Sequence, residues 1–219
     1  MIEVINLDNT PSLASRFMRE LRDITIQSDP LRFRRNLERI GEIMAYEISK
    51  RLDYYDEVSD TPLSKANAKE ANEKIVLATI LRAGLPFHHG FLNYFDHAEN
   101  AFVSAYRKYK EKGDKFDVLV EYLASPDIEG KTLIIVDPML ATGSSMELGY
   151  RAILNNGTPS KIHVASVIAS QQAIDYVSRV MPQDKTTIWT AAIDPEINSH
   201  SYIVPGLGDA GDLAFGVKL

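Results

Sequence analysis

The chain has 219 residues, of which 45% are hydrophobic and 25% charged, and its formal net charge is −6. These values fit one globular domain over residues 1–219 with a large buried core. The acidic balance gives no general attraction to nucleic acid or to an anionic membrane, and the absence of cysteine excludes disulfides and thiolate chemistry. No segment reaches the ~20 apolar residues of a membrane span, and residues 1–8 lack the features of a secretory leader. We therefore expect a cytoplasmic protein that binds small molecules.

Residues 1–60 are expected to form a helical lead-in to the domain. Residues 1–28 show only irregular or short helical periodicity, whereas Asp29 and Pro30 are typical of a helix cap and first turn. Apolar residues then recur at helical spacing, with charged residues between them. That charged face indicates either simple solvation or a subunit contact. Residues 59–64 predict a loop or a short hairpin.

Strands and helices alternate from residue 75 onward, which predicts an α/β fold with a doubly wound, mostly parallel sheet. The turn-forming residues Lys112–Asp114 indicate a hairpin that projects from this sheet. Ligands bind outside the carboxyl ends of parallel strands, so the loops after the strands are where a site is expected. In chain order, the predicted elements are a strand at 75–81, a helix at 85–95, a strand at 101–106, a return arm at 118–123, a strand at 132–136, a helix at 146–154, a strand at 162–169, a helix at 171–180 and a strand at 186–192.

The most informative pattern follows the apolar run Thr132–Val136. The pattern begins with an acidic residue, continues with a turn of small and hydroxylated residues, and ends where a helix starts. Its residues are Asp137, Pro138, Met139, Leu140, Ala141, Thr142, Gly143, Ser144 and Ser145. Backbone amides at such a turn, together with the positive end of the helix dipole, bind a phosphate monoester. The lysine of a P-loop and the spaced glycines of a dinucleotide fold are missing. We therefore expect a sugar phosphate whose hydroxyls meet Asp137.

Three segments together resemble type I phosphoribosyltransferases, and the uracil phosphoribosyltransferase family in particular. They are Ile80–Leu85, Asp137–Ser145 and Tyr202–Asp212, and they stand in the family's order. One such loop alone would be suggestive, whereas the three together are specific, and the resemblance covers residues 18–216. It implies the type I phosphoribosyltransferase fold, with a projecting β-hairpin and a small C-terminal hood in which residues 194–216 form the base-binding loop.

The resemblance also implies an activity. The 5-phosphoribosyl group would pass from 5-phospho-α-D-ribose 1-diphosphate to uracil, giving UMP and diphosphate. Asp137 would accept hydrogen bonds from the ribose hydroxyls and stabilise the positive charge that develops on the sugar, although taken alone it equally suits a turn or helix-capping role. No nucleophile is needed, and Mg²⁺ would be held mainly by substrate oxygens and water, so no protein metal site is expected.

The diphosphate is expected to lie against the loop after the first core strand. Arg82, Ala83 and Gly84 would supply a guanidinium and backbone amides, and Arg107 would add a second cation from the projecting hairpin, near Lys108 and Lys110. Asp209 would reach the diphosphate through the magnesium shell. The implied catalytic residues are Asp137, Arg82 and Asp209. The implied phosphoribosyl-diphosphate site is Arg82, Ala83, Gly84, Arg107, Asp137, Pro138, Met139, Leu140, Ala141, Thr142, Gly143, Ser144, Ser145 and Asp209.

The base is expected in the glycine-rich C-terminal loop, which offers few side chains besides two carboxylates. By resemblance, uracil would be held by Ile203, Gly208, Asp209 and Ala210, largely through backbone groups, with Tyr202 covering the base. A flexible glycine-rich tail is the alternative interpretation.

Other functions on the same fold stay open. One is a phosphoribosyltransferase for orotate or a purine, although orotate needs a cation and no Lys or Arg lies between Tyr202 and Phe215. The other is an RNA-binding regulator of pyrimidine genes, which would need a basic face. The family further implies a homodimer or larger homo-oligomer, and GTP is a candidate effector.

Overall fold

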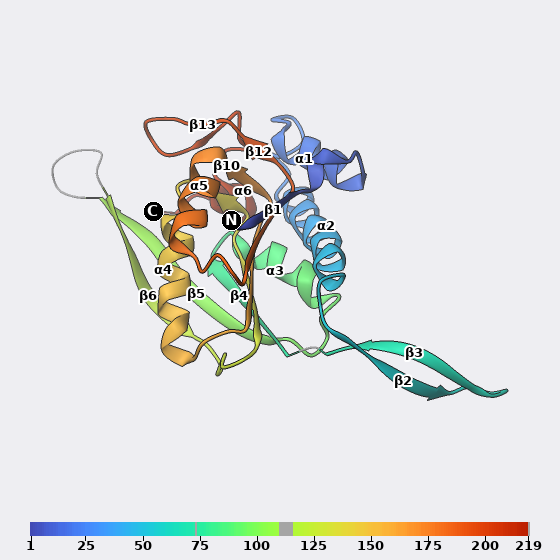
Figure 1. The fold of residues 1–219 in the computed structure, drawn as a ribbon. Helices are drawn as coiled ribbons and strands as arrows, with labels where there is room; N and C mark the ends of the chain where they lie inside the picture. The colour runs from blue at the N-terminus through green and yellow to red at the C-terminus, as the bar shows by residue number, and fades with distance from the viewer. Residues whose placement is uncertain (73, 110–115, 219) are drawn as a thin grey trace.

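The computed structural model describes residues 1–72, 74–109 and 116–218 (Figure 1). The strands of its central sheet are β1 (Glu3–Asn6), β4 (Ile75–Leu81), β5 (Glu99–Tyr109), β6 (Phe116–Ala124), β7 (Thr132–Val136), β9 (Lys161–Ser166) and β11 (Thr186–Thr190). They lie in the order β1-β11-β9-β7-β4-β5-β6, and all the described pairs are parallel except β5–β6. The predicted mostly parallel sheet is confirmed, whereas the turn predicted at Lys112–Asp114 falls outside the described residues.

Helices cover both faces of this sheet (Figure 1). Side chains alternate along each buried strand, so each strand contributes to two hydrophobic cores. The helices are α1 (Leu13–Arg22), α2 (Pro30–Ser49), α3 (Gly84–Leu92), α4 (Ser144–Ile153), α5 (Gln171–Val180) and α6 (Ala210–Phe215). None within the described ranges is long and apolar enough to cross a bilayer. In β4, Ile75 and Leu77 belong to the core that contains α2 and α3, while Val76 and Ala78 belong to the core that contains α4 and α5.

The N-terminal segment differs in part from the prediction. Its first residues form β1, a parallel edge strand in which Val4 lies opposite Ile188 of β11. A strand of four residues is too short for alternation to identify, and its hydrogen bonds come from a segment far away in sequence. The start of α2 is as predicted, because the Asp29 carboxylate accepts hydrogen bonds from the amides of Leu31 and Arg32 at 2.9 and 3.2 Å.

Three smaller sheets surround the central one. Their strands are β2 (Tyr54–Asp60) with β3 (Lys65–Ala71), β8 (Met139–Leu140) with β10 (Ile168–Ser170) and β12 (Ile193–Asp194), and β13 (Glu196–Ile197) with β14 (Ile203–Val204). The single strand predicted at 162–169 is therefore two strands, because β10 leaves the central sheet to pair with β8 and β12. The loop or short hairpin predicted at 59–64 is the tip of a longer hairpin, β2–β3, which projects from the body of the protein (Figure 1).

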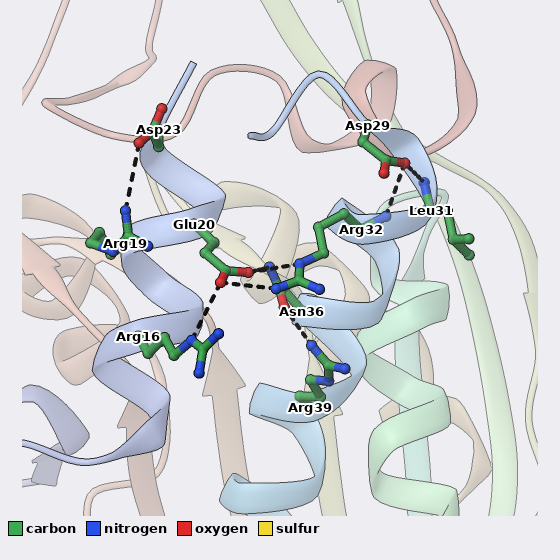
Figure 2. A network of polar contacts seen from close by, with 9 residues as sticks. All are labelled: Arg16, Arg19, Glu20, Asp23, Asp29, Leu31, Arg32, Asn36 and Arg39. Carbon is green, nitrogen blue, oxygen red and sulfur yellow. Dashed lines mark hydrogen bonds and ion pairs between the residues drawn. The ribbon is translucent and has the colours of Figure 1, made fainter. Parts of the chain in front are cut away.

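A buried carboxylate joins α1 to α2 (Figure 2). Glu20 accepts hydrogen bonds from the Arg32 guanidinium at 2.8 and 3.0 Å and from the Asn36 amide at 2.8 Å. Chiefly because of the hydrogen bond from Arg32 and then that from Asn36, the pKa of Glu20 falls to about 2. The pairing joins Glu20 of α1 to the first turns of α2.

The low pKa of Glu20 predicts a pH-dependent contribution to stability. Its native pKa of about 2 lies below the ordinary value of 4.5, so the contribution is full above about pH 4.5 and is lost as the pH falls toward 2. Glu20→Gln should lower the free energy of unfolding at pH 7 by about 2 kcal/mol, through loss of charge-assisted hydrogen bonds.

Urea denaturation at pH 7 and pH 3 measures this difference, which should shrink at pH 3. Glu47→Gln is the matched control, because Glu47 forms an exposed ion pair with Lys50 and should change stability by less than about 1 kcal/mol. An equal loss for Glu20→Gln at both pH values would contradict the assignment.

Candidate active site

The loop between β7 and α4 surrounds an open hollow at the carboxyl end of the central sheet. The hollow is lined by Asp137, Met139, Leu140, Ala141, Thr142, Gly143, Ser145 and Met146. All of these except Met146 belong to the predicted phosphoribosyl-diphosphate set. The predicted loop is therefore a real concavity, placed where the alternating fold predicts a ligand.

Gly143 determines the shape of this loop. Its φ is +83°, and a Cβ there would lie 2.8 Å from Cδ1 of Tyr176 and 3.1 Å from Cγ2 of Val177, both on α5. Only glycine suits that backbone and that close approach. Gly143 has no side chain to cap α4, and the Ser144 amide makes only a long hydrogen bond, 3.4 Å, to Oγ1 of Thr142. The helix dipole favours an anion at this end of α4.

Asp137 combines a turn contact with a place in the hollow. Its Oδ1 accepts a hydrogen bond from the Met139 amide at 3.1 Å, while its own amide donates to the Ala165 carbonyl at 3.1 Å. The side chain is half-buried and lines the hollow. The turn role considered from sequence is therefore present, and it orients the carboxylate beside the loop.

Arg82 connects the first loop to the C-terminal segment. It follows β4 through a cis Leu81–Arg82 peptide, and its Nη2 donates to Oδ1 of Asp212 at 3.2 Å and to the Gly216 carbonyl at 3.4 Å. Two of the three sequence motifs therefore meet through a direct contact. The Arg82 side chain remains 42% exposed, so its guanidinium is accessible to a ligand.

The C-terminal hood is more regular than predicted. Residues 194–216 are predicted to form a loop, yet they contain the short strands β13 and β14 and the helix α6. Asp209 caps this helix, because its Oδ1 accepts the Asp212 amide at 3.0 Å. A six-residue helix is too short to show a periodic pattern. The available signal in the sequence was Asp209 itself, because aspartate is a preferred N-cap residue.

The other predicted base-site residues occupy different environments. Ile203 and Ala210 are buried, Gly208 has a φ of +89°, and Tyr202 is 41% exposed. Arg107 lies in β5 opposite Val118, and its contact with a ligand stays a prediction. Lys110 lies outside the described residues. Within the described ranges, no three His, Asp or Glu side chains gather in a way that could hold a metal ion.

Sequence reasoning missed the residues that attach the hood to the body. Arg34 of α2 donates to the Ala214 carbonyl at 2.6 Å, and Arg22 of α1 bonds both Asp194 and Gly206. Nothing in local spacing predicts these contacts, because the partners lie far apart in the chain.

Comparison with known proteins gives the same result as the motifs. A family model described as uracil phosphoribosyltransferase matches residues 9–217. The chain belongs to the uracil phosphoribosyltransferase family. A uracil phosphoribosyltransferase of Porphyromonas gingivalis is 66% identical over 100% of both chains. One of Methanothermobacter thermautotrophicus is 40% identical over 86% of this chain and 85% of its own.

A solved structure shows the same fold. The AQ2163 protein from Aquifex aeolicus superimposes with a TM-score of 0.86 at 27% identity, over 99% of each chain. The resemblance expected from residues 18 to 216 is therefore confirmed, and the family match extends further toward the N-terminus.

The position of Arg82 predicts a selective binding defect. Arg82→Ala should weaken binding of the phosphoribosyl diphosphate by at least about tenfold, since a charge-assisted contact to the leaving group is lost. UMP has no leaving group, so its affinity should change much less. Calorimetry with Mg²⁺ present measures both ligands, with Arg51→Ala as control because Arg51 pairs with the exposed Glu3. Equal weakening of both ligands would place Arg82 away from the diphosphate.

Proposed function

We propose that this protein transfers the 5-phosphoribosyl group from 5-phospho-α-D-ribose 1-diphosphate to uracil, giving UMP and diphosphate. The observation that carries the proposal is the hollow after β7, which Asp137 and the start of α4 line together. Such a space suits a ribose 5-phosphate, because amides bind the phosphate while the carboxylate meets the sugar hydroxyls. Family membership supports the same reaction.

The residues of the hollow would act by position and charge. The phosphate would lie against the loop Thr142–Ser145, and the diphosphate against Arg82, Ala83 and Gly84. Asp137 would stabilise positive charge on the sugar as the bond to the leaving group lengthens. Holding both substrates in line supplies much of the rate enhancement in a reaction that needs no protein nucleophile.

Magnesium is the expected cofactor. Mg²⁺ prefers oxygen ligands and keeps several waters, so the substrate diphosphate would supply most of its coordination. Asp209, at the start of α6, is the carboxylate that would contact its shell, and its cap to the Asp212 amide orients it. When bound, the ion would neutralise charge on the departing diphosphate. An effector role for GTP stays a prediction, and adding GTP to the same assay tests it.

The RNA-binding alternative depends on a basic surface. Arginines do gather over α1 and α2 (Figure 2), but acidic side chains pair with many of them. Arg16 and Arg32 contact Glu20, Arg19 contacts Asp23, and Arg35 contacts Glu38. This pairing reduces the field available to a phosphate backbone, which favours the enzyme.

Replacing the carboxylate tests the catalytic role directly. Asp137→Asn keeps the shape and the turn contact but should lower kcat by about two to four orders of magnitude, because a transition-state charge partner is lost. Asp127→Asn is a matched control, since Asp127 makes the same type of turn contact, to the Glu129 amide at 2.9 Å, outside the hollow. Diphosphate release measures both variants, and near-normal turnover of Asp137→Asn would leave Asp137 as a turn residue only.

The choice of base follows from backbone recognition. Uracil presents an acceptor, a donor and an acceptor along one edge, which backbone groups around Ile203, Gly208 and Ala210 would match. Cytosine reverses two of these groups, so uracil should be preferred by about 10³ in kcat/KM. 5-Fluorouracil should also react, whereas orotate and adenine should not. A diphosphate-release assay over this panel tests the function, and comparable values for cytosine and uracil would refute the base site.

A homo-oligomer is the expected assembly, and the hairpin β2–β3 is its proposed contact. An isolated two-stranded hairpin is marginally stable in water, yet this one exposes Tyr54, Tyr55, Val58 and Leu63. A second copy of the chain would bury them. Val58→Asp with Leu63→Asp should lower the oligomer mass in sedimentation velocity, whereas Tyr94→Ser, at an exposed site elsewhere, should not. An unchanged mass for the double variant would exclude the hairpin as the contact.

A further inference from the structure

A buried ion pair lies directly behind the proposed base-binding loop. Nη1 and Nη2 of Arg22, in the last turn of α1, donate to Oδ2 and Oδ1 of Asp194, both at 2.8 Å. The Asp194 side chain is only 6% exposed, and that of Arg22 is 26% exposed. Parallel bonds of this kind fix the orientation of both groups and not only their separation.

The same two side chains hold one glycine of the hood from both sides. The Gly206 amide donates to Oδ2 of Asp194 at 2.8 Å, and the Gly206 carbonyl accepts from Nη1 of Arg22 at 3.0 Å. Gly206 has a φ of +64°, and a Cβ there would lie 2.0 Å from the Ile203 carbonyl oxygen. No other residue suits this turn. Because glycine has no side chain, the ion pair contacts only its backbone groups.

A neighbouring side chain adds a further contact on the same stretch. Nε2 of Gln27, in the loop after α1, donates to the Leu21 carbonyl at 2.8 Å and to the Leu207 carbonyl at 3.3 Å. Consecutive hood residues, Gly206 and Leu207, are therefore held by the segment that ends α1. Gly208, the next residue, belongs to the proposed uracil site.

Asp194 is also connected to the phosphate loop. It ends β12, where it lies opposite Ser170 of β10, and β10 pairs in turn with β8 in the phosphate loop. The Ser170 hydroxyl donates to the Ala141 carbonyl at 2.6 Å. One short sheet thus carries the loop that would hold the phosphate at one edge and the carboxylate that holds the hood at the other.

We propose that Arg22 and Asp194 are positioning residues that hold the Ile203–Gly208 turn at a fixed place relative to the phosphate loop, and so determine the affinity for the pyrimidine base without touching it. The inference rests on the proposed function, because it concerns the base site of that reaction. Recognition of the base by backbone groups requires this turn to be fixed, since a carbonyl or an amide cannot change rotamer to follow a displaced ligand.

The electrostatics of the pair are consistent with this role. Burial alone would raise the pKa of Asp194, but hydrogen bonds from Arg22 and Gly206 lower it below the ordinary 3.8. The carboxylate is therefore charged at neutral pH. Removing Arg22 leaves the Asp194 carboxylate buried without its counter-charge. Removing either side chain also takes one hydrogen bond from Gly206.

The experiment separates the affinities for the two substrates. Arg22→Ala and Asp194→Asn should each raise the KM for uracil by about 10- to 100-fold, as expected when buried backbone groups lose their hydrogen bonds to the base. The KM for the phosphoribosyl diphosphate should change by less than about threefold, because the hollow after β7 is untouched. Arg22→Lys should recover part of the uracil affinity, since it keeps the charge.

Glu20→Gln is the matched control for a general loosening of α1. Glu20 anchors the same helix to α2 but does not contact the hood. It should lower the melting temperature and leave the KM for uracil unchanged. If it raises that KM as much as Arg22→Ala does, the effect is a structural consequence of a loosened helix and the positioning role is refuted.

Hydrogen exchange in the protein without substrates gives a second readout. The Gly206 amide should exchange faster in Asp194→Asn and Arg22→Ala than in the unaltered protein, and no faster in Glu20→Gln. If the unaltered protein makes no UMP, the proposed function fails while this exchange measurement still tests whether the pair holds the turn. If it makes UMP and the Arg22 and Asp194 variants keep its uracil KM, the inference fails and the function stands.

Discussion

The placement of β7 between β4 and β9 is the constraint on which the site depends. These strands are parallel and in register, with Thr79 opposite Val136 and Val136 opposite Ala165. Their carboxyl ends therefore lie along one edge, and the residues that follow them, such as Asp137, emerge there together. Parallel pairing buries both faces of each strand, which explains the nearly continuous apolar sequences of β4 and β7. The strands form the apolar core, and the polar groups lie in the loops that follow them.

The parallel sheet gathers the loops, but it does not by itself fix their spacing. That task falls to the small sheet β8-β10-β12 and to the contacts from α1 and α2 onto the hood. Ser170 bonds the phosphate loop and stands opposite Asp194, which bonds the hood. These short strands thus connect the loop between β7 and α4 to the hood, which are proposed to bind the phosphate and the base. Glu20 lies outside this frame, because its hydrogen bonds go to Arg32 and Asn36 of α2 and not to the hood.

Sequence reasoning succeeded where information is local. The apolar strands, the Asp29 cap and the turn between β7 and α4 are each contained in about ten consecutive residues or fewer, and the structure has them all. It failed for β1 and α6, which are too short for periodicity to be detected. It also failed for Asp194, which has no distinguishing neighbours in sequence. The role of Asp194 comes from a partner in α1 and from a β-pairing, and neither of these is visible along the chain.

The ion pair of Arg22 and Asp194 has a structural role that offsets the free-energy cost of removing these charged groups from water. A well-packed apolar pair in the same space would be equally stable or more so. It could not, however, accept the Gly206 amide and donate to the Gly206 carbonyl at once. Hydrogen bonds are directional and apolar contacts are not, so only the polar pair fixes the orientations of the two peptide groups on either side of the Gly206 Cα. A base site made of glycine backbone has few side chains of its own to define it. In the proposed base site, selectivity would therefore depend on polar residues, such as Arg22 and Asp194, that do not contact the base.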